Sequence, residues 1–135
     1  MKLHRSSFLT LASVVALAIG AFAVAAPQAL LAGKGVAPPL DAAAIWVREL
    51  GVNILALGLT LFLVRKQPLS PTLRAVLVGN AVVHLGLFPI ELAAYHQGVI
   101  TRLSGVVPNS ILHLGFAAAF LWHATRKPPA NADVG

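Results

Sequence analysis

The sequence predicts an all-α protein, a four-transmembrane-helix bundle, and three observations support this prediction. Hydrophobic residues make up 58% of the 135-residue chain and charged residues only 10%, whereas water-soluble domains contain about 25% charged residues. The apolar residues form four runs of about 20 residues, which is the length that a helix needs to cross a hydrocarbon core of roughly 30 Å. Segments with proline, glycine and charge separate the runs and indicate turns.

The four predicted helices cover residues 8–26, 42–64, 75–95 and 105–125. The segments 27–41, 65–74 and 96–104 between them are predicted to be turns. Residues 1–126 are expected to form one membrane domain, because the chain is long enough for a single domain. The polar segment 127–135, which contains two prolines, is expected to be a flexible C-terminal tail.

The first apolar run has two interpretations. The segment "MKLHR", followed by the run and by "AVAA", is also typical of a secretory signal peptide. The run 8–26 is longer than the usual apolar core of a signal peptide, about 7–15 residues. We therefore favour a retained helix over a cleaved signal peptide.

The distribution of Lys and Arg predicts the orientation in the membrane. Seven of the ten basic residues would lie on the side of the two termini and the second turn, and three on the opposite side. Because positive charge collects on the cytoplasmic side, both termini are expected in the cytoplasm. The two groups are Lys2, Arg5, Arg65, Lys66, Arg74, Arg126 and Lys127 on the inside, and Lys34, Arg48 and Arg102 on the outside.

The composition also excludes several classes of function. The chain has no cysteine, which excludes disulfides, thiol catalysis and thiolate metal sites. The net charge of +6 comes from scattered residues that form no basic stripe, so we expect no nucleic-acid partner. No serine lies in a pattern typical of a hydrolase triad, and we predict no catalytic residue.

Polar residues fall on one face of each of the last three predicted helices. At 100° per residue, their spacing places each set in a narrow stripe. Lipid offers such groups no hydrogen-bond partner, and an unpaired one costs several kcal/mol. We therefore expect the stripes to face each other inside the bundle. They consist of Glu49, Asn53 and Thr60, then Asn80, His84, Glu91 and Tyr95, and finally Asn109, His113 and His123.

Counting residues from the predicted turns places these side chains in two layers, which we interpret as a pocket for a ligand or a proton. Arg48 or His113 is expected to neutralise Glu91, whose charge is tolerated better near the membrane boundary than at its centre. Pro89 is expected to kink the helix and free a carbonyl group beside the pocket. A structural ion pair that pins three helices is the alternative. The outer layer consists of Arg48, Glu49, Glu91, Tyr95, Asn109 and His113, and the deeper layer of Asn53, Asn80 and His84.

Four histidines in the last two predicted helices and the turn between them raise the question of a haem or metal site. His84 and His113 are predicted to differ in depth by about five residues, or roughly 7 Å at 1.5 Å per residue. His96 and His123 are predicted at opposite ends, and no spacing typical of a zinc enzyme is present. We predict no metal and no cofactor, with a quinone or a haem left open as alternatives.

Small residues repeat along the last three predicted helices. Such repeats allow close approach of helices, either in a dimer or within one bundle. We favour packing within one bundle. The pairs are Gly51 with Gly58, Gly79 with Gly86, and Gly115 with Ala119.

Three segments resemble a known family. They are "PQALLAGKG" (27–35), "WVRELGVNILALGLTLFLVRK" (46–66) with its R-x-x-G pattern, and "VVPNSILHLG" (106–115). Together they resemble small bacterial four-helix membrane proteins of the DoxX-like kind and their domain-of-unknown-function relatives, over residues 8–125. The resemblance implies a four-helix bundle in the cytoplasmic membrane with Arg48 near the outer face, and some relatives are linked with quinone-coupled oxidoreductases. The segment "GLFPIELAAYHQG" (86–98) does not map onto the family pattern.

We therefore favour a non-enzymatic role for this chain. It would be a small integral membrane protein whose outward-facing polar pocket, built on Arg48, Glu91 and His113, takes a small molecule, a proton or a partner subunit. One alternative is a membrane anchor subunit of a quinone-linked oxidoreductase, and another is a purely structural or assembly protein. The expected partners are the lipid bilayer and either a membrane partner subunit or a second copy of the chain.

Overall fold

The computed structural model describes residues 4–126 and shows an all-helical chain over that range. The predicted tail 127–135, and Lys2 and Lys127 of the charge distribution, lie outside the described residues. The all-α class and the four long helices are therefore confirmed. The helices are α1 (Arg5–Ala25), α2 (Pro27–Gly33), α3 (Asp41–Val64), α4 (Pro71–His96), the 3-10 helix η1 (Leu103–Gly105) and α5 (Val107–Thr125).

The short helix α2 is a departure from the prediction, because its residues were expected to form a turn. Pro27 occupies the first turn of α2, where its missing N–H would have had no partner within the helix. The helix has only seven residues, so the criterion of membrane-spanning length could not identify it. Its position matters because it returns the chain beneath the bundle and places Lys34 near α4 and α5.

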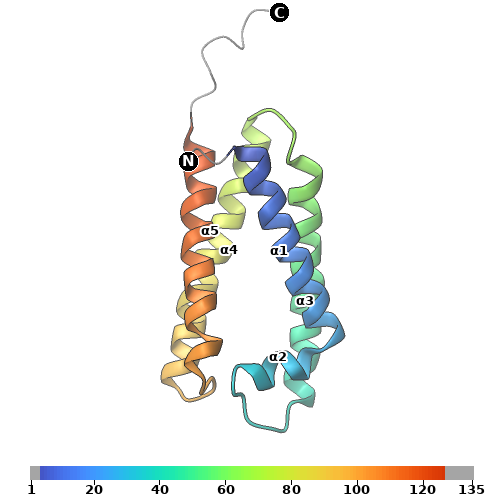
Figure 1. Ribbon diagram of the computed structural model, residues 1–135, viewed down its shortest axis with the longest axis vertical. Helices are drawn as coiled ribbons and strands as arrows, with labels where there is room; N and C mark the ends of the chain where they lie inside the picture. Colours follow the sequence, from blue (N-terminus) through green and yellow to red (C-terminus); the bar gives the residue numbers. More distant parts are fainter. Residues whose placement is uncertain (1–3, 127–135) are drawn as a thin grey trace, which may run out of the picture.

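The four long helices form two antiparallel pairs (Figure 1). Helix α1 packs along α3, and α4 packs along α5, whereas contacts between the two pairs are few. The pairs lie close together at the end that contains the α3–α4 connection and spread apart toward the end that contains α2 (Figure 1). This arrangement leaves space for side chains and a cavity between the pairs.

A hydrophobic cluster joins the two pairs at the narrow end. The ring centroids of Phe8 and Phe120 are 4.9 Å apart in an edge-on contact, a favourable geometry for aromatic pairs. At the same end, Arg74 donates hydrogen bonds to the C=O groups of Ala124, in the last turn of α5, and of Arg126, just after it, where a cation is stabilising. The buried members of the cluster are Phe8, Leu9, Ala12, Leu61, Leu73, Leu77, Ala81, Phe120 and Ala124.

Glycines on one face bring α1 and α3 into close contact. A Cβ atom at Gly20 would lie 2.9 Å from the C=O oxygen of Gly51, and the Ser13 hydroxyl donates to the Gly58 C=O at 2.9 Å. The predicted packing of Gly51 and Gly58 within one bundle is therefore confirmed.

The same prediction is wrong for the other glycines of the repeats. Added Cβ atoms at Gly79, Gly86 and Gly115 would meet nothing within 4 Å among the described residues. Helices α4 and α5 are held together by larger side chains, so these three glycines do not serve close packing within the bundle.

All four long helices are long and apolar enough to cross a membrane. Large apolar side chains cover their outer surfaces, including Leu63, Ile90 and Ile111, which are 65%, 65% and 70% exposed. A hydrocarbon environment suits such a surface. The fold is therefore that expected of a multi-pass membrane protein.

Candidate functional site: a cleft between two helix pairs

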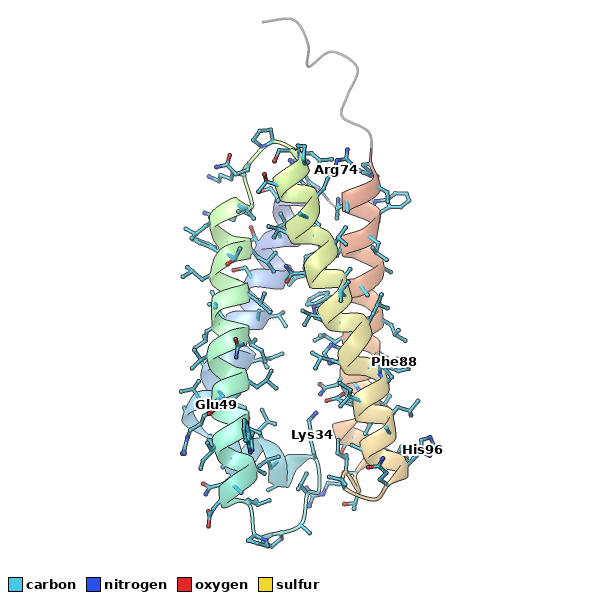
Figure 2. The ribbon with its side chains drawn as sticks, turned by 180° about the vertical axis from the view of Figure 1, so that it is seen from behind. Lys34, Glu49, Arg74, Phe88 and His96 are labelled. Atoms are coloured by element: carbon cyan, nitrogen blue, oxygen red, sulfur yellow. The ribbon has the colours of Figure 1, made fainter. Side chains whose placement is uncertain are left out.

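A cavity of about 500 Å³ lies between the two helix pairs, and α2 forms part of its lining. Most of its walls are apolar, and its four polar side chains come from the segment after α2 and from α4 and α5. Figure 2 shows the Lys34 side chain pointing from the wide end into the space between the pairs. The polar lining residues are Lys34, Glu91, Asn109 and His113, and the apolar ones include Ile19, Phe22, Leu30, Leu50, Ile54, Leu87 and Leu112.

Glu91 is the centre of the polar group in this cleft. Lys34 forms a salt bridge with its Oε1 atom, and the Asn109 amide donates to the same oxygen at 2.9 Å. The side chains of Lys34 and Glu91 are only 19% and 13% exposed. Three segments far apart in the sequence are thus joined at one carboxylate.

The predicted partner of Glu91 is wrong in part, because Lys34 and not Arg48 forms the salt bridge. Arg48 is exposed, and its Nε atom lies 3.4 Å from the Val24 C=O oxygen. The reason is the helix α2, which carries Lys34 back under the cleft, while Arg48 lies on an exposed surface of α3.

Backbone contacts join the same two regions, and we name residues 34–35 together with residues 101–105 the clasp. The Lys34 C=O accepts hydrogen bonds from the N–H groups of Thr101 and Arg102, both at 3.2 Å. The Thr101 hydroxyl donates to the Gly35 C=O at 2.8 Å. A Cβ atom at Gly105 would lie 2.8 Å from the Lys34 Cα. The clasp therefore connects the two helix pairs at the wide end, opposite the hydrophobic cluster.

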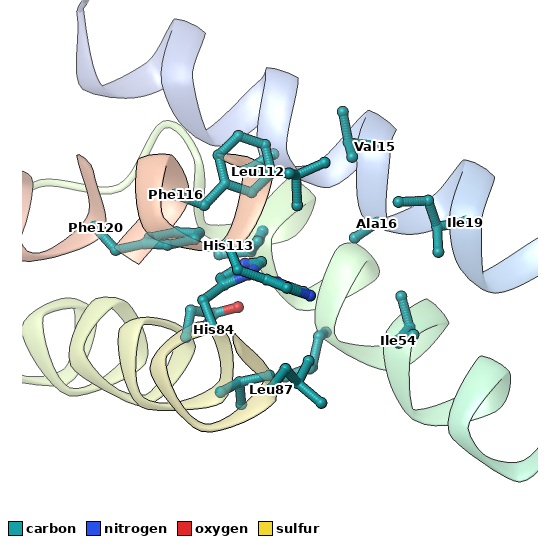
Figure 3. A pocket seen from close by; sticks show the side chains of 15 residues that line it. Val15, Ala16, Ile19, Ile54, His84, Leu87, Leu112, His113, Phe116 and Phe120 are labelled. Carbon is teal, nitrogen blue, oxygen red and sulfur yellow. The ribbon is translucent and has the colours of Figure 1, made fainter. Parts of the chain in front are cut away.

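Two histidines meet deeper in the cleft. The Nδ1 atoms of His84 and His113 are 2.9 Å apart, a hydrogen-bond distance that requires one ring to donate and the other to accept. The centroid of the His84 ring lies 5.3 Å from that of Phe116 and 5.8 Å from that of Phe120. Figure 3 shows the two histidines between these phenylalanines and the apolar side chains of α1 and α3.

The contact between His84 and His113 contradicts the expectation that they lie at different depths. His84 lies twelve residues before the end of α4, and His113 lies six residues after the start of α5. At 1.5 Å per residue the difference is about 9 Å. The connection 97–106 compensates for this difference in depth, because it is longer than a tight turn. It contains η1, and it buries Ile100 and Val106.

The histidine pair lines a second cavity, of about 80 Å³. Asn80 also lines it, and the Asn80 amide donates to the Val76 C=O of its own helix at 2.8 Å. The two cavities adjoin, because five residues line both of them. These residues are Ile19, Ile54, Leu87, Leu112 and His113.

The predicted inward stripe on α3 is wrong. Glu49, Asn53 and Thr60 are exposed, and they lie about 160–200° around the helix from the glycines that pack on α1. The Asn53 amide donates to the Glu49 C=O at 2.9 Å, and the Thr60 hydroxyl to the Ala56 C=O at 2.8 Å. Bonds of this kind to the preceding turn satisfy polar side chains locally, so no facing helix is needed.

Tyr95 and His123 also lie apart from the polar group of the cleft. The Tyr95 ring lies against that of His96, with centroids 6.2 Å apart. His123 is buried at the narrow end and stacks on Phe8 at 5.1 Å. Helix α4 continues through Pro89 to His96, and Pro89 leaves the Leu85 carbonyl without its usual donor.

The structure thus brings five of the nine predicted site residues to the cleft and adds Lys34. The sequence offered one signal for Lys34, the "GKG" segment at 33–35, which was interpreted only as a turn. The five residues at the cleft are Asn80, His84, Glu91, Asn109 and His113, and the four outside it are Arg48, Glu49, Asn53 and Tyr95.

Comparisons with protein-family models, curated proteins and solved structures find no match for this chain. The fold and the cleft therefore define the class, an all-helical protein with four helices able to span a membrane.

Proposed function

We propose that the chain is a multi-pass membrane protein that binds a small amphipathic molecule in the cleft between its two helix pairs. One observation carries this proposal. The cavity of about 500 Å³ has mostly apolar walls and a buried polar group at one end. Binding sites for small molecules typically measure about 300–1,000 Å³ and combine apolar walls with a few polar groups. The role proposed here is binding, not catalysis.

The proposed location is a bacterial inner membrane, with both termini in the cytoplasm and the wide end of the cleft outside. Positive charge in the described residues supports this orientation. Arg5 bonds to the Gln67 C=O at the narrow end, where Arg65, Arg74 and Arg126 also lie, and basic residues collect on the cytoplasmic side. Lys34, by contrast, is neutralised by Glu91.

Comparison of two leucine variants on one helix tests the proposal. Leu112 lines both cavities, whereas Leu114, two residues away, is 46% exposed and lines neither. We expect about one small amphipathic molecule per chain to co-purify with the wild-type protein and with Leu114→Trp. Leu112→Trp fills the cleft and should lower the bound amount by about fivefold or more, as measured by mass spectrometry of extracts. Equal retention by the two variants, or no bound molecule in any sample, contradicts the proposal.

The second candidate is a membrane anchor subunit of a quinone-linked oxidoreductase, which accords with the DoxX-like resemblance. The histidine pair supports it, because an imidazole N–H can donate to a quinone carbonyl, and Phe116 and Phe120 offer aromatic faces beside the pair. A quinone that co-purifies with the wild-type protein and is lost in His113→Leu supports this candidate. A membrane extract from which no quinone follows the purified protein argues against it.

A further inference from the structure

The carboxylate of Glu91 has one oxygen that is satisfied and one that is not. Oε1 accepts from both Lys34 and Asn109, whereas Oε2 is buried and has no hydrogen-bond partner among residues 4–126. Leaving a buried acceptor unsatisfied destabilises the protein, and more so when the group is charged. Native proteins rarely leave such groups unpaired. Glu91 lines the larger cavity, and a small rotation of its carboxylate about the broad terminal torsion of Glu can bring the buried Oε2 within reach of a donor on a bound molecule.

The charges around Oε2 select the kind of donor. Among the residues that line the cavity, Lys34 carries the positive charge and Glu91 the negative one, and they neutralise each other. An anionic headgroup would be repelled by the carboxylate and would find its cation already paired. A cationic amine would compete with Lys34 for Glu91. An uncharged hydroxyl group can donate to Oε2 and leave the salt bridge intact.

The apolar walls determine what the rest of the molecule must be. They extend from the cavity beside Glu91 into the smaller cavity beside His84, because Ile19, Ile54, Leu87 and Leu112 line both. A hydrocarbon chain in this space contacts apolar side chains and stays out of water. A chain anchored at Glu91 would therefore point toward the histidine pair.

We propose that the ligand is an uncharged amphiphile, a long-chain alcohol or an acylglycerol, whose hydroxyl group donates to Glu91 Oε2. Its hydrocarbon chain lies between the helix pairs, against Leu87 and Leu112. This inference rests on the proposed function, because it names the ligand class of the same cleft.

Three probes that share one hydrocarbon chain test the headgroup: oleyl alcohol, oleate and oleylamine. Each is added in radiolabelled form to the full-length protein in lipid nanodiscs, and binding is measured by equilibrium titration against empty nanodiscs. We expect the alcohol to bind with a Kd about tenfold or more below those of the other two. Leu112→Trp should weaken its binding by about tenfold or more and Leu114→Trp should not. Glu91→Gln should weaken alcohol binding by about tenfold, because the charged acceptor is lost.

The outcomes separate this inference from the proposed function. Tighter binding of oleate or oleylamine, with the same loss in Leu112→Trp, overturns the hydroxyl inference and leaves the proposed function intact. Absence of binding for all three probes, or binding unaffected by Leu112→Trp, overturns both. If Glu91→Gln does not fold, the ranking of the three probes on the wild-type protein still decides the headgroup, since that ranking needs no variant at Glu91.

Discussion

The salt bridge of Lys34 with Glu91 is the residue-scale feature on which the cleft depends. Both charges are largely removed from solvent, and each reduces the cost of burying the other. Neither helix pair contains both residues, because Lys34 follows α2 and Glu91 belongs to α4. The salt bridge therefore contributes to the spacing of the two pairs as well as to the charge of the site.

Removal of Lys34 alone should destabilise the protein more than removal of both charges. Lys34→Met leaves the Glu91 carboxylate without its cation, and breaking a buried ion pair in this way costs about 3–5 kcal/mol, less for a pair that is partly exposed. The double variant Lys34→Met with Glu91→Gln leaves no buried charge and should recover at least half of the loss. Unfolding in mixed micelles, followed by circular dichroism, measures both. A double variant no more stable than Lys34→Met would contradict this account.

The sequence predicted which polar side chains face the interior best where a polar residue stood alone in an apolar run. Glu91, Asn109, His84 and His113 were identified from the sequence in this way. Their partners were predicted less well. Lys34 is 57 residues from Glu91, and no periodicity links it to α4. Asn53 was wrongly placed because a side chain that bonds to its own helix shows the same spacing as one that faces inward.

At the scale of elements, the two opposite faces of α3 make different kinds of contact. Its glycines contact α1, and its polar residues bond to the preceding turn on the exposed face. Close contact of helix backbones is a common way to hold helices together where lipid supplies no hydrophobic driving force. The α1–α3 pair should therefore depend on its small residues.

Alanine at Gly20 and alanine at Gly79 should have opposite effects. A Cβ atom at Gly20 would lie 2.9 Å from the backbone N of Leu55, whereas one at Gly79 meets nothing within 4 Å in the part of the chain that the structure describes. Both changes favour the helix by about 1 kcal/mol, but overpacking at Gly20 should cost about 1–3 kcal/mol. Gly20→Ala should thus lower the unfolding temperature and Gly79→Ala should maintain or raise it. Equal effects would show that the contact between α1 and α3 is not tight.

The clasp offers a second matched pair of glycines. Gly35 and Gly98 both have positive φ angles, 77° and 72°, so alanine is strained at either position. At Gly35 the added Cβ would clash with the Thr101 hydroxyl, whereas at Gly98 it would meet nothing within 4 Å among residues 4–126. Gly35→Ala should increase amide hydrogen exchange at residues 101–102 by about tenfold, and Gly98→Ala should not. Equal exchange in the two variants would show that the clasp does not stabilise the wide end.

At the scale of the whole molecule, two helix pairs are joined at both ends and separated between them. Apolar residues join them at the narrow end, and the clasp and the salt bridge join them at the wide end. The cavity lies between the two pairs and is bounded at the wide end by the salt bridge. The form of this cavity is set by the arrangement of the pairs and not by one motif.

The orientation of the molecule can be tested directly because the chain has no native cysteine. Ala37, in the α2–α3 connection, and Lys66, in the α3–α4 connection, are both exposed. We expect Ala37→Cys to react with a membrane-impermeant maleimide in intact spheroplasts, and Lys66→Cys to react only after lysis. The reverse pattern of labelling would invert the proposed orientation and place the wide end of the cleft in the cytoplasm.

The sequence by itself determined the number of long helices, their bounds to within a few residues and their membrane character, because length and hydropathy are properties of each segment alone. It also identified Glu91 and the histidines as polar groups in need of partners. Only the tertiary structure decided which partners they have. The return of the chain through α2 and the ten residues of the connection 97–106 set the relative heights of the helices. Those heights depend on packing between segments, which a pattern within one segment does not contain.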